Sequence, residues 1–97
     1  PYTTLFRSTA TFQMRELGKA QAMSELPGMF KIVSDGATGK VLGVHIAGAH
    51  ATDLIAEAGL ALRLGASVRD IAATVHAHPT LAEGLYEAAL SLVEAGG

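Results

Sequence analysis

The sequence predicts an α+β domain in which an antiparallel sheet carries helices packed on one face. In its first half, apolar and polar side chains alternate with a period of two residues, which is typical of strands. After Gly48 the apolar period changes to about 3.6 residues, which indicates helices. Strands that precede the helices, rather than alternate with them, favour an α+β arrangement. The 97 residues suffice for one domain with one modest core.

Three strands are predicted, at residues 9–15, 29–34 and 41–47. Residues 16–27 contain a glycine and a proline and are interpreted as a connection. Residues 35–40 have the composition of a turn, too short for a parallel crossover, so the second and third strands should form an antiparallel hairpin. The side chains expected on one face of each strand are Phe12 and Met14, then Phe30 and Ile32, then Leu42, Val44 and Ile46.

Three helices are predicted after the strands. The first covers residues 53–64, with Thr52 as its N-cap and Gly65 as its stop. Residues 67–70 resemble a capping box that opens a short second helix, and a last helix covers about residues 81–94. The apolar stripes expected to face the core are Ile55, Ala58 and Leu62 in the first helix, and Leu81, Leu85, Ala88 and Leu92 in the last.

The composition narrows the classes of partner. A formal net charge of -2 and the absence of a basic stripe argue against nucleic acid. Charged residues make up 16% of the chain, against about 25% in a typical domain. The 49% hydrophobic content reflects either abundant helical alanine or a face covered by a second chain, and we favour the covered face because leucine, isoleucine and valine contribute to it.

The chain has no cysteine, and therefore no thiolate nucleophile or cysteine-based metal site. No apolar run approaches the roughly 18–20 residues that span a bilayer, and no signal peptide is visible. The expectation is therefore a cytoplasmic protein with no membrane partner.

Residues 75–83, Val-His-Ala-His-Pro-Thr-Leu-Ala-Glu, contain the side chains most used in acid–base chemistry. His78 precedes the last predicted helix and Glu83 lies in its first turn. Histidine titrates near neutral pH, and a carboxylate that accepts its Nδ1 proton leaves Nε2 as a base. This pattern makes His78 and Glu83 the candidate catalytic residues.

Simpler interpretations of the same residues stay open. Thr80 to Glu83 is a capping-box pattern, in which Glu83 binds a backbone N–H, and capping and catalysis can hold together. His76 and His78 can be ordinary loop histidines. His-x-His with a carboxylate can also ligate zinc, although the local sequence has no third dedicated ligand, so no metal is expected. Two further histidines are interpreted as structural, His45 and His50.

The string His76-Ala77-His78-Pro79-Thr80-Leu81-x-Glu83 resembles the C-terminal signature of dihydrolipoamide dehydrogenases, flavoproteins of the pyridine nucleotide–disulfide oxidoreductase family. The resemblance continues through residues 28–33, 38–45 and 51–57, and covers roughly residues 11–90. Glutathione reductases share the His-Pro-Thr and Glu core but differ around it. The paired histidines and the leucine after the threonine favour the lipoamide enzyme.

The resemblance implies that His78 is the catalytic base and Glu83 the acid that orients it. It implies a homodimer in which this histidine reaches the active disulfide of the other subunit, and a cis peptide bond before Pro79. It also implies that the parent enzyme binds FAD and NAD. The expected substrate of that enzyme is the dihydrolipoyl group of a lipoyl-bearing acyltransferase. None of these cofactors is expected on the chain alone, because it contains no G-x-G-x-x-G turn.

The sequence also predicts how the chain is organised. Residues 1–8 look like a foreign, adapter-derived tail, with a genuine loop and strand start as the alternative. Residues 9–97 resemble a C-terminal dimerisation (interface) domain that lacks its first strand. Two alternatives remain for the function of the domain. It can be a non-catalytic homodimerisation module, or the same domain of another disulfide reductase.

Overall fold

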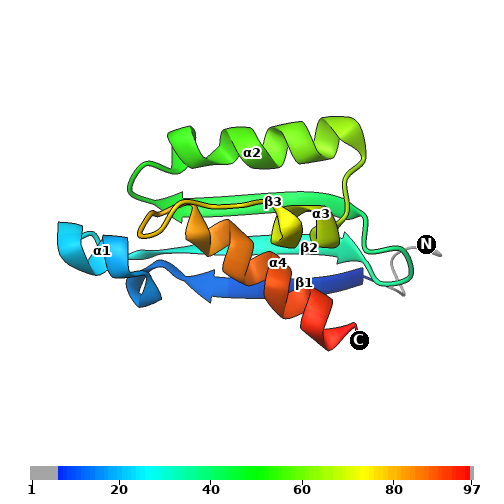
Figure 1. The fold of residues 1–97 in the computed structure, drawn as a ribbon, viewed down its shortest axis with the longest axis horizontal. Coiled ribbons are helices and arrows are strands. Elements are labelled where there is room, and N and C mark those ends of the chain that lie inside the picture. The colour runs from blue at the N-terminus through cyan, green and yellow to red at the C-terminus, as the bar shows by residue number, and fades with distance from the viewer. Residues whose placement is uncertain (1–6, 97) are drawn as a thin grey trace.

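The computed structural model describes residues 7–96, which contain a three-stranded antiparallel sheet in the order β1-β2-β3 (Figure 1). The strands are β1 at Arg7–Gln13, β2 at Gly28–Asp35 and β3 at Val41–Gly48. In the β2–β3 turn, Asp35 Oδ1 accepts the backbone N–H groups of Ala37 and Thr38, at 2.8 and 3.1 Å. The predicted hairpin is therefore confirmed.

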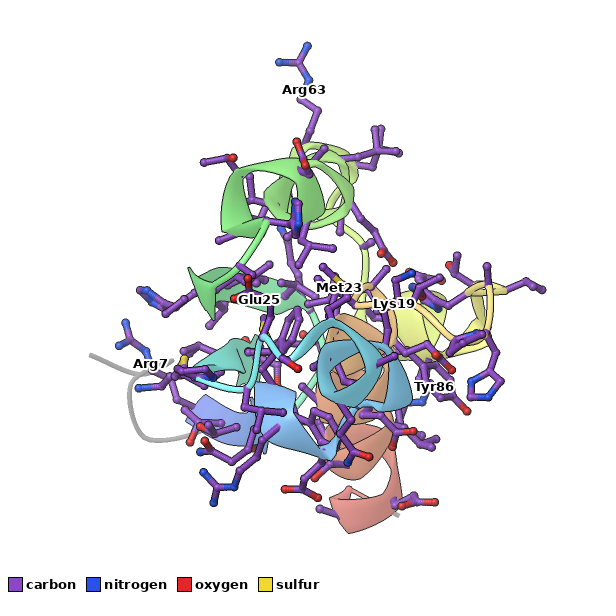
Figure 2. The ribbon with its side chains drawn as sticks, turned by 90° about the vertical axis from the view of Figure 1, so that its left-hand side faces the viewer. Arg7, Lys19, Met23, Glu25, Arg63 and Tyr86 are labelled. Atoms are coloured by element: carbon purple, nitrogen blue, oxygen red, sulfur yellow. The ribbon has the colours of Figure 1, made fainter. Side chains whose placement is uncertain are left out.

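The helices lie against this sheet in two places. α4 crosses the face of β1 and β2 with α3 packed against it, and α2 runs along β3 (Figure 1). Arg63 on α2 points away from the rest of the chain (Figure 2). The α+β class with an antiparallel sheet is confirmed. The helices are a 3-10 helix at Met14–Glu16, α1 at Gly18–Met23, α2 at Ala51–Leu64, α3 at Val68–Ala73 and α4 at Glu83–Ala95.

The core lies between β2 and α4. Phe30 and Ile32 are fully buried on the inner face of β2, as predicted, and all four residues of the last predicted stripe are buried. The helix approaches the strand closely at Gly84, where a Cβ atom would overlap the ring of Phe30. The absence of a side chain at this position fixes how near the first turn of α4 comes to the sheet.

A β-bulge changes which residues of β3 face the core. The β2–β3 register shifts between Val33 and Ser34, so that Ser34 pairs with Val41 and Val33 with Gly43. Val41 is 2% exposed and Leu42 is 40% exposed. The prediction of Leu42 as a core residue was therefore wrong, because one extra residue in a bulge reverses the alternation on one side of it.

The buried face of α2 also differs from the prediction. Ala58 is buried as predicted, together with Ala61, whereas Ile55 and Leu62 of the predicted stripe are 39% and 42% exposed. Apolar residues occur on most sides of this helix, so its periodicity does not select one face. Alanines let the helix approach β3, and among the larger side chains Leu54 is partly buried against the core.

The ends of several elements differ from their predicted positions. Residues 16–27 contain α1, which no side chain caps and which buries Ala20 in the core, so tertiary contacts rather than local signals define it. α2 begins before Thr52, after His50 with a φ of 62°. Arg7 and Ser8, assigned to the foreign tail, pair with β2. The rest of that tail lies outside the described residues, and its origin stays a prediction.

Candidate functional site

The candidate site is the segment between α3 and α4, and the local sequence fixes where that segment begins. α3 opens with the predicted capping box, in which Ser67 and Asp70 bind each other's backbone N–H groups. The helix ends at Thr74, whose hydroxyl donates to the carbonyl of Asp70 at 2.7 Å. The chain then runs in extended form and turns back into α4, with a cis peptide bond between His78 and Pro79, as the resemblance implies.

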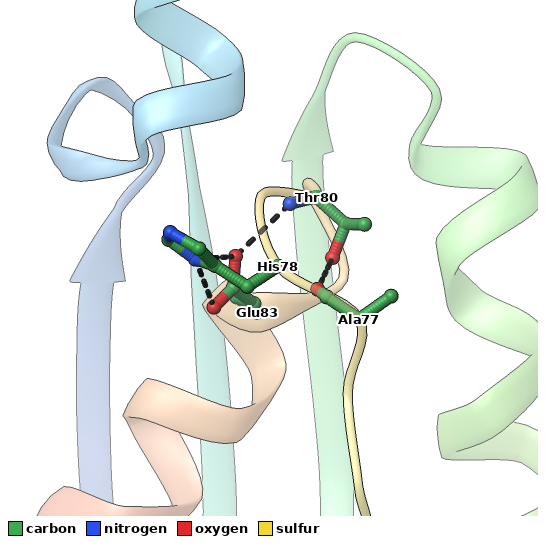
Figure 3. Close-up of polar contacts among 4 residues, drawn as sticks. All are labelled: Ala77, His78, Thr80 and Glu83. Atoms are coloured by element: carbon green, nitrogen blue, oxygen red, sulfur yellow. Dashed lines mark hydrogen bonds and ion pairs between the residues drawn. The ribbon is translucent and has the colours of Figure 1, made fainter.

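The structure brings His78 and Glu83 together at this turn (Figure 3). The Nδ1 atom of His78 lies 3.0 and 2.9 Å from the two carboxylate oxygens of Glu83. An ionised carboxylate only accepts hydrogen bonds, so the Nδ1 atom donates. In the neutral imidazole this leaves Nε2 with a free lone pair, as a general base requires.

Glu83 also holds the backbone of the turn. Its Oε1 accepts the backbone N–H of Thr80 at 2.9 Å, while the Thr80 hydroxyl donates to the carbonyl of Ala77 at 2.7 Å (Figure 3). Half of the predicted capping box is therefore present, because the threonine side chain turns back into the loop. The helix begins at Glu83 rather than at residue 81. Capping and contact with His78 coexist in one carboxylate.

These contacts set the charge of Glu83. The hydrogen bond from Thr80, and next the one from His78, lower the pKa of Glu83 below its ordinary value of 4.5, against the opposite effect of burial. The carboxylate therefore stays ionised throughout the neutral range. A fixed negative charge beside Nδ1 stabilises the imidazolium that forms when Nε2 takes a proton.

The two side chains differ in accessibility. The imidazole of His78 is 77% exposed, whereas the side chain of Glu83 is 20% exposed. An oriented but accessible imidazole can take a proton from a group outside this domain. The partly covered carboxylate can hold the imidazole without meeting that group.

His76 differs from the ordinary loop histidine that its local sequence suggests. Its side chain is 6% exposed, and its Nε2 atom lies 2.7 Å from Oε2 of Glu57 on α2. Its Nδ1 atom is buried without a hydrogen-bond partner among the described residues. The ring packs on Tyr86 of α4, with centroids 5.6 Å apart. No local pattern predicts this pair, because its members are 19 positions apart in the sequence.

A pocket of about 380 Å³ is lined by one member of each histidine pair, His76 and Glu83. Tyr86 and the end of α3 complete its wall. His78 is not part of this lining, so its imidazole projects from the turn outside the pocket.

The other two histidines lie apart from this region. His45 is exposed on β3, and His50 makes a loose contact with Asp53, at 3.5 Å between exposed side chains. Within residues 7–96 no group of three or more His, Cys, Asp or Glu side chains is arranged to hold a metal ion. Among the same residues, no helix is both long enough and apolar enough to cross a membrane.

The chain matches a known protein family and several known proteins. The family described as "Pyridine nucleotide-disulphide oxidoreductase, dimerisation domain" matches residues 6–89. A dihydrolipoyl dehydrogenase of Chlorobaculum tepidum is 47% identical over 85 residues, which are 88% of this chain and 18% of that protein. A dihydrolipoyl dehydrogenase of Bacillus subtilis is 48% identical over 80 residues, 82% of this chain and 17% of that protein. The chain thus spans less than a fifth of these relatives.

Solved structures share the fold. LpdA from Mycobacterium tuberculosis superposes with a TM-score of 0.85 at 27% identity, over 89% of this chain and 19% of that one. The HOCl-induced flavoprotein disulfide reductase RclA from Escherichia coli gives a TM-score of 0.81 at 18% identity, over 87% of this chain and 19% of that one. At 18% identity, the similarity to RclA shows a shared fold and nothing more.

Proposed function

Because the chain belongs to the dimerisation-domain family of the pyridine nucleotide-disulphide oxidoreductases, we propose that it serves as that domain of a dihydrolipoyl dehydrogenase. In this proposal His78 is the base that deprotonates the dihydrolipoyl thiol, and Glu83 orients it. The observation that carries the proposal is the accessible imidazole of His78, held through Nδ1 by an ionised carboxylate. The identity of about 47% to dihydrolipoyl dehydrogenases supports this substrate class over that of other disulfide reductases.

The proposed chemistry follows from the thiol. A free thiol with a pKa near 8.5 is mostly protonated at about pH 7, and only the thiolate attacks a disulfide. Nε2 of His78 takes the proton, Glu83 stabilises the resulting imidazolium, and the thiolate attacks the disulfide of the parent enzyme. This attack forms a mixed disulfide and releases one enzyme cysteine as a thiolate. Attack by the second substrate thiol then closes the substrate disulfide and releases the other cysteine, so that the dithiol is oxidised and the enzyme disulfide is reduced. Both cysteines of that disulfide lie outside this chain, which has none.

The cofactors belong to the rest of the parent enzyme in this proposal. FAD and NAD supply the two-electron transfer that reoxidises its dithiol. We expect no dinucleotide site on the described residues alone, because their strands are antiparallel and no Gly-rich turn joins a strand to a helix as a pyrophosphate cradle. The contribution of this chain is therefore a proton acceptor and a subunit contact.

Self-association is the second part of the proposal, with a lipoyl-bearing acyltransferase as the partner of the whole enzyme. Large apolar side chains remain exposed on α2 and after α3, including Leu60 at 60%, Leu64 at 72% and Val75 at 95%. Such surface favours contact with a second copy. We expect the chain to sediment as a species larger than a monomer at micromolar concentration. A single, stable monomer boundary in sedimentation velocity would argue against it.

The Glu83→Gln substitution tests the orienting role. An amide retains a carbonyl oxygen that can accept the Thr80 N–H, but it loses the charge that holds and polarises His78. In a full-length enzyme that carries this domain, we expect the turnover of dihydrolipoamide to fall about 10–100-fold. Steady-state kinetics measure the loss. Unchanged turnover in the variant would mean that Glu83 acts as a helix cap and nothing more.

The pH dependence of stability gives a control on the same variant. Folding lowers the pKa of Glu83, so the carboxylate stabilises the folded state above its ordinary pKa of 4.5. That contribution is lost as the pH falls through the lower, folded-state value. The difference in unfolding temperature between the parent and Glu83→Gln should therefore close as the pH falls below 4.5 and through the folded-state value. A difference that persists in full well below that pH would contradict the assigned charge.

A further inference from the structure

We propose that His76 and Glu57 form a positioning pair that anchors the segment carrying His78 to α2. The inference rests on the proposed role of His78 as the base and adds two residues that act through it. It assigns the two histidines of the His-Ala-His string to different tasks. The buried one fixes the loop, and the exposed one carries out the chemistry.

The geometry of the pair supports an anchor. Nε2 of His76 lies 2.7 Å from Oε2 of Glu57, and the two side chains are 6% and 30% exposed. The carboxylate can only accept, so Nε2 carries the proton. His76 thus has the tautomer opposite to that of His78, whose proton lies on Nδ1 against Glu83. The two imidazoles face two different carboxylates, and neither competes for the partner of the other.

The anchor matters because little else ties this segment to the fold. Of the polar contacts that residues 75–80 make within the described chain, those of His78 and Thr80 stay inside the loop or end on Glu83. The contact of His76 with Glu57 is the one that reaches α2. The ring of His76 also packs on Tyr86 of α4, at an interplanar angle of 45°. His76 therefore connects the loop to α2 and to α4, two positions before the base.

Direct chemistry by His76 is less consistent with its surroundings. Its Nε2 is occupied by Glu57 and its Nδ1 is buried. Neither nitrogen is open to a thiol that arrives from outside the domain. A metal-binding role lacks a third ligand, because no such cluster exists among residues 7–96. The remaining role is to hold the backbone that presents His78.

The test uses a full-length enzyme that carries this domain. His76→Phe keeps an aromatic ring beside Tyr86 but removes the donor to Glu57, whereas His76→Gln retains an amide donor. We expect His76→Phe to lower kcat for dihydrolipoamide about 10–100-fold, the usual cost of losing an outer hydrogen-bond partner, with little change in KM. His76→Gln should recover most of the activity. The limb of the pH–rate profile that reports His78 should shift in His76→Phe, because a loosened imidazole loses its carboxylate.

Two carboxylates on α2 provide a matched control. Glu57→Ala and Asp53→Ala each remove one carboxylate from this helix near a histidine, so that the histidine loses its acceptor. Asp53 faces the exposed His50 at 3.5 Å, far looser than the contact of Glu57. We expect Glu57→Ala to lower kcat in the same direction as His76→Phe and Asp53→Ala to leave it unchanged. Equal effects from both variants would overturn the specific pairing.

A double substitution separates positioning from other roles. If His76 acts through His78, His76→Phe should cause no further loss in a His78→Gln background. An equal further loss there would overturn the inference, as would unchanged kcat in His76→Phe with only a lower unfolding temperature. The proposed function has a different point of failure. Full activity of His78→Gln alone would refute it, whereas an inactive His78→Gln beside a fully active His76→Phe would refute only the positioning pair.

Discussion

Replacement of His78 by glutamine is expected to lower the oxidation of dihydrolipoamide by about 10²–10⁴-fold in a full-length enzyme that carries this domain. Glutamine fills a similar volume but cannot accept and hold a proton near neutral pH. The loss should appear equally in kcat and in kcat/KM, because His78 takes the proton in the chemical step and does not contribute to binding of the substrate. Steady-state kinetics with a dithiol substrate measure both constants.

Two controls make this result specific to the base. His78 is 77% exposed, so its substitution should change the free energy of unfolding by no more than about 0.5 kcal/mol. Electron flow from NADH to an artificial acceptor does not involve the substrate thiol and should remain near the parent rate. A variant that oxidises dihydrolipoamide at the parent rate would remove His78 from the mechanism. Equal loss in both assays would point to a damaged fold instead.

A methyl group added at Gly84 is expected to destabilise the domain by about 1–3 kcal/mol. The new Cβ would overlap the ring of Phe30, which is fully buried. α4 must then move away from β2, and Glu83 at its first position moves with it. Thermal unfolding should show a fall of about 4–8 °C for each kcal/mol in a domain of this size. Turnover should also fall, because small displacements of positioned groups are costly.

Gly59 on α2 is the matched control for this substitution. A Cβ at Gly59 meets no atom within 4 Å. Gly59→Ala should therefore raise stability by about 0.5–1 kcal/mol through helix propensity alone. Opposite signs for the two alanine substitutions would attribute the loss at Gly84 to its contact with Phe30. Similar changes in both variants would show that this contact does not limit the packing of α4.

The sequence by itself determined the features that depend on neighbours within a few positions. The hairpin follows from alternation on both sides of a short turn, and the capping box at Ser67 follows from a spacing of three residues. The meeting of His78 with Glu83 belongs to this class, because five positions of chain bridge a turn and the start of a helix. The catalytic role of the two residues rests on resemblance and stays a proposal.

Only the tertiary structure decided which faces are buried and which distant residues meet. Because of the bulge in β3, Val41 rather than Leu42 faces the core. α2 buries Ala58 and Ala61, because small side chains let the helix pack closely against a strand, and it leaves the larger Ile55 and Leu62 more exposed. The contact of His76 with Glu57 joins segments 19 positions apart, which no local spacing encodes. Local patterns indicate which helix or strand a segment can form. The packing of segments against one another determines which face is buried and which distant residues come into contact.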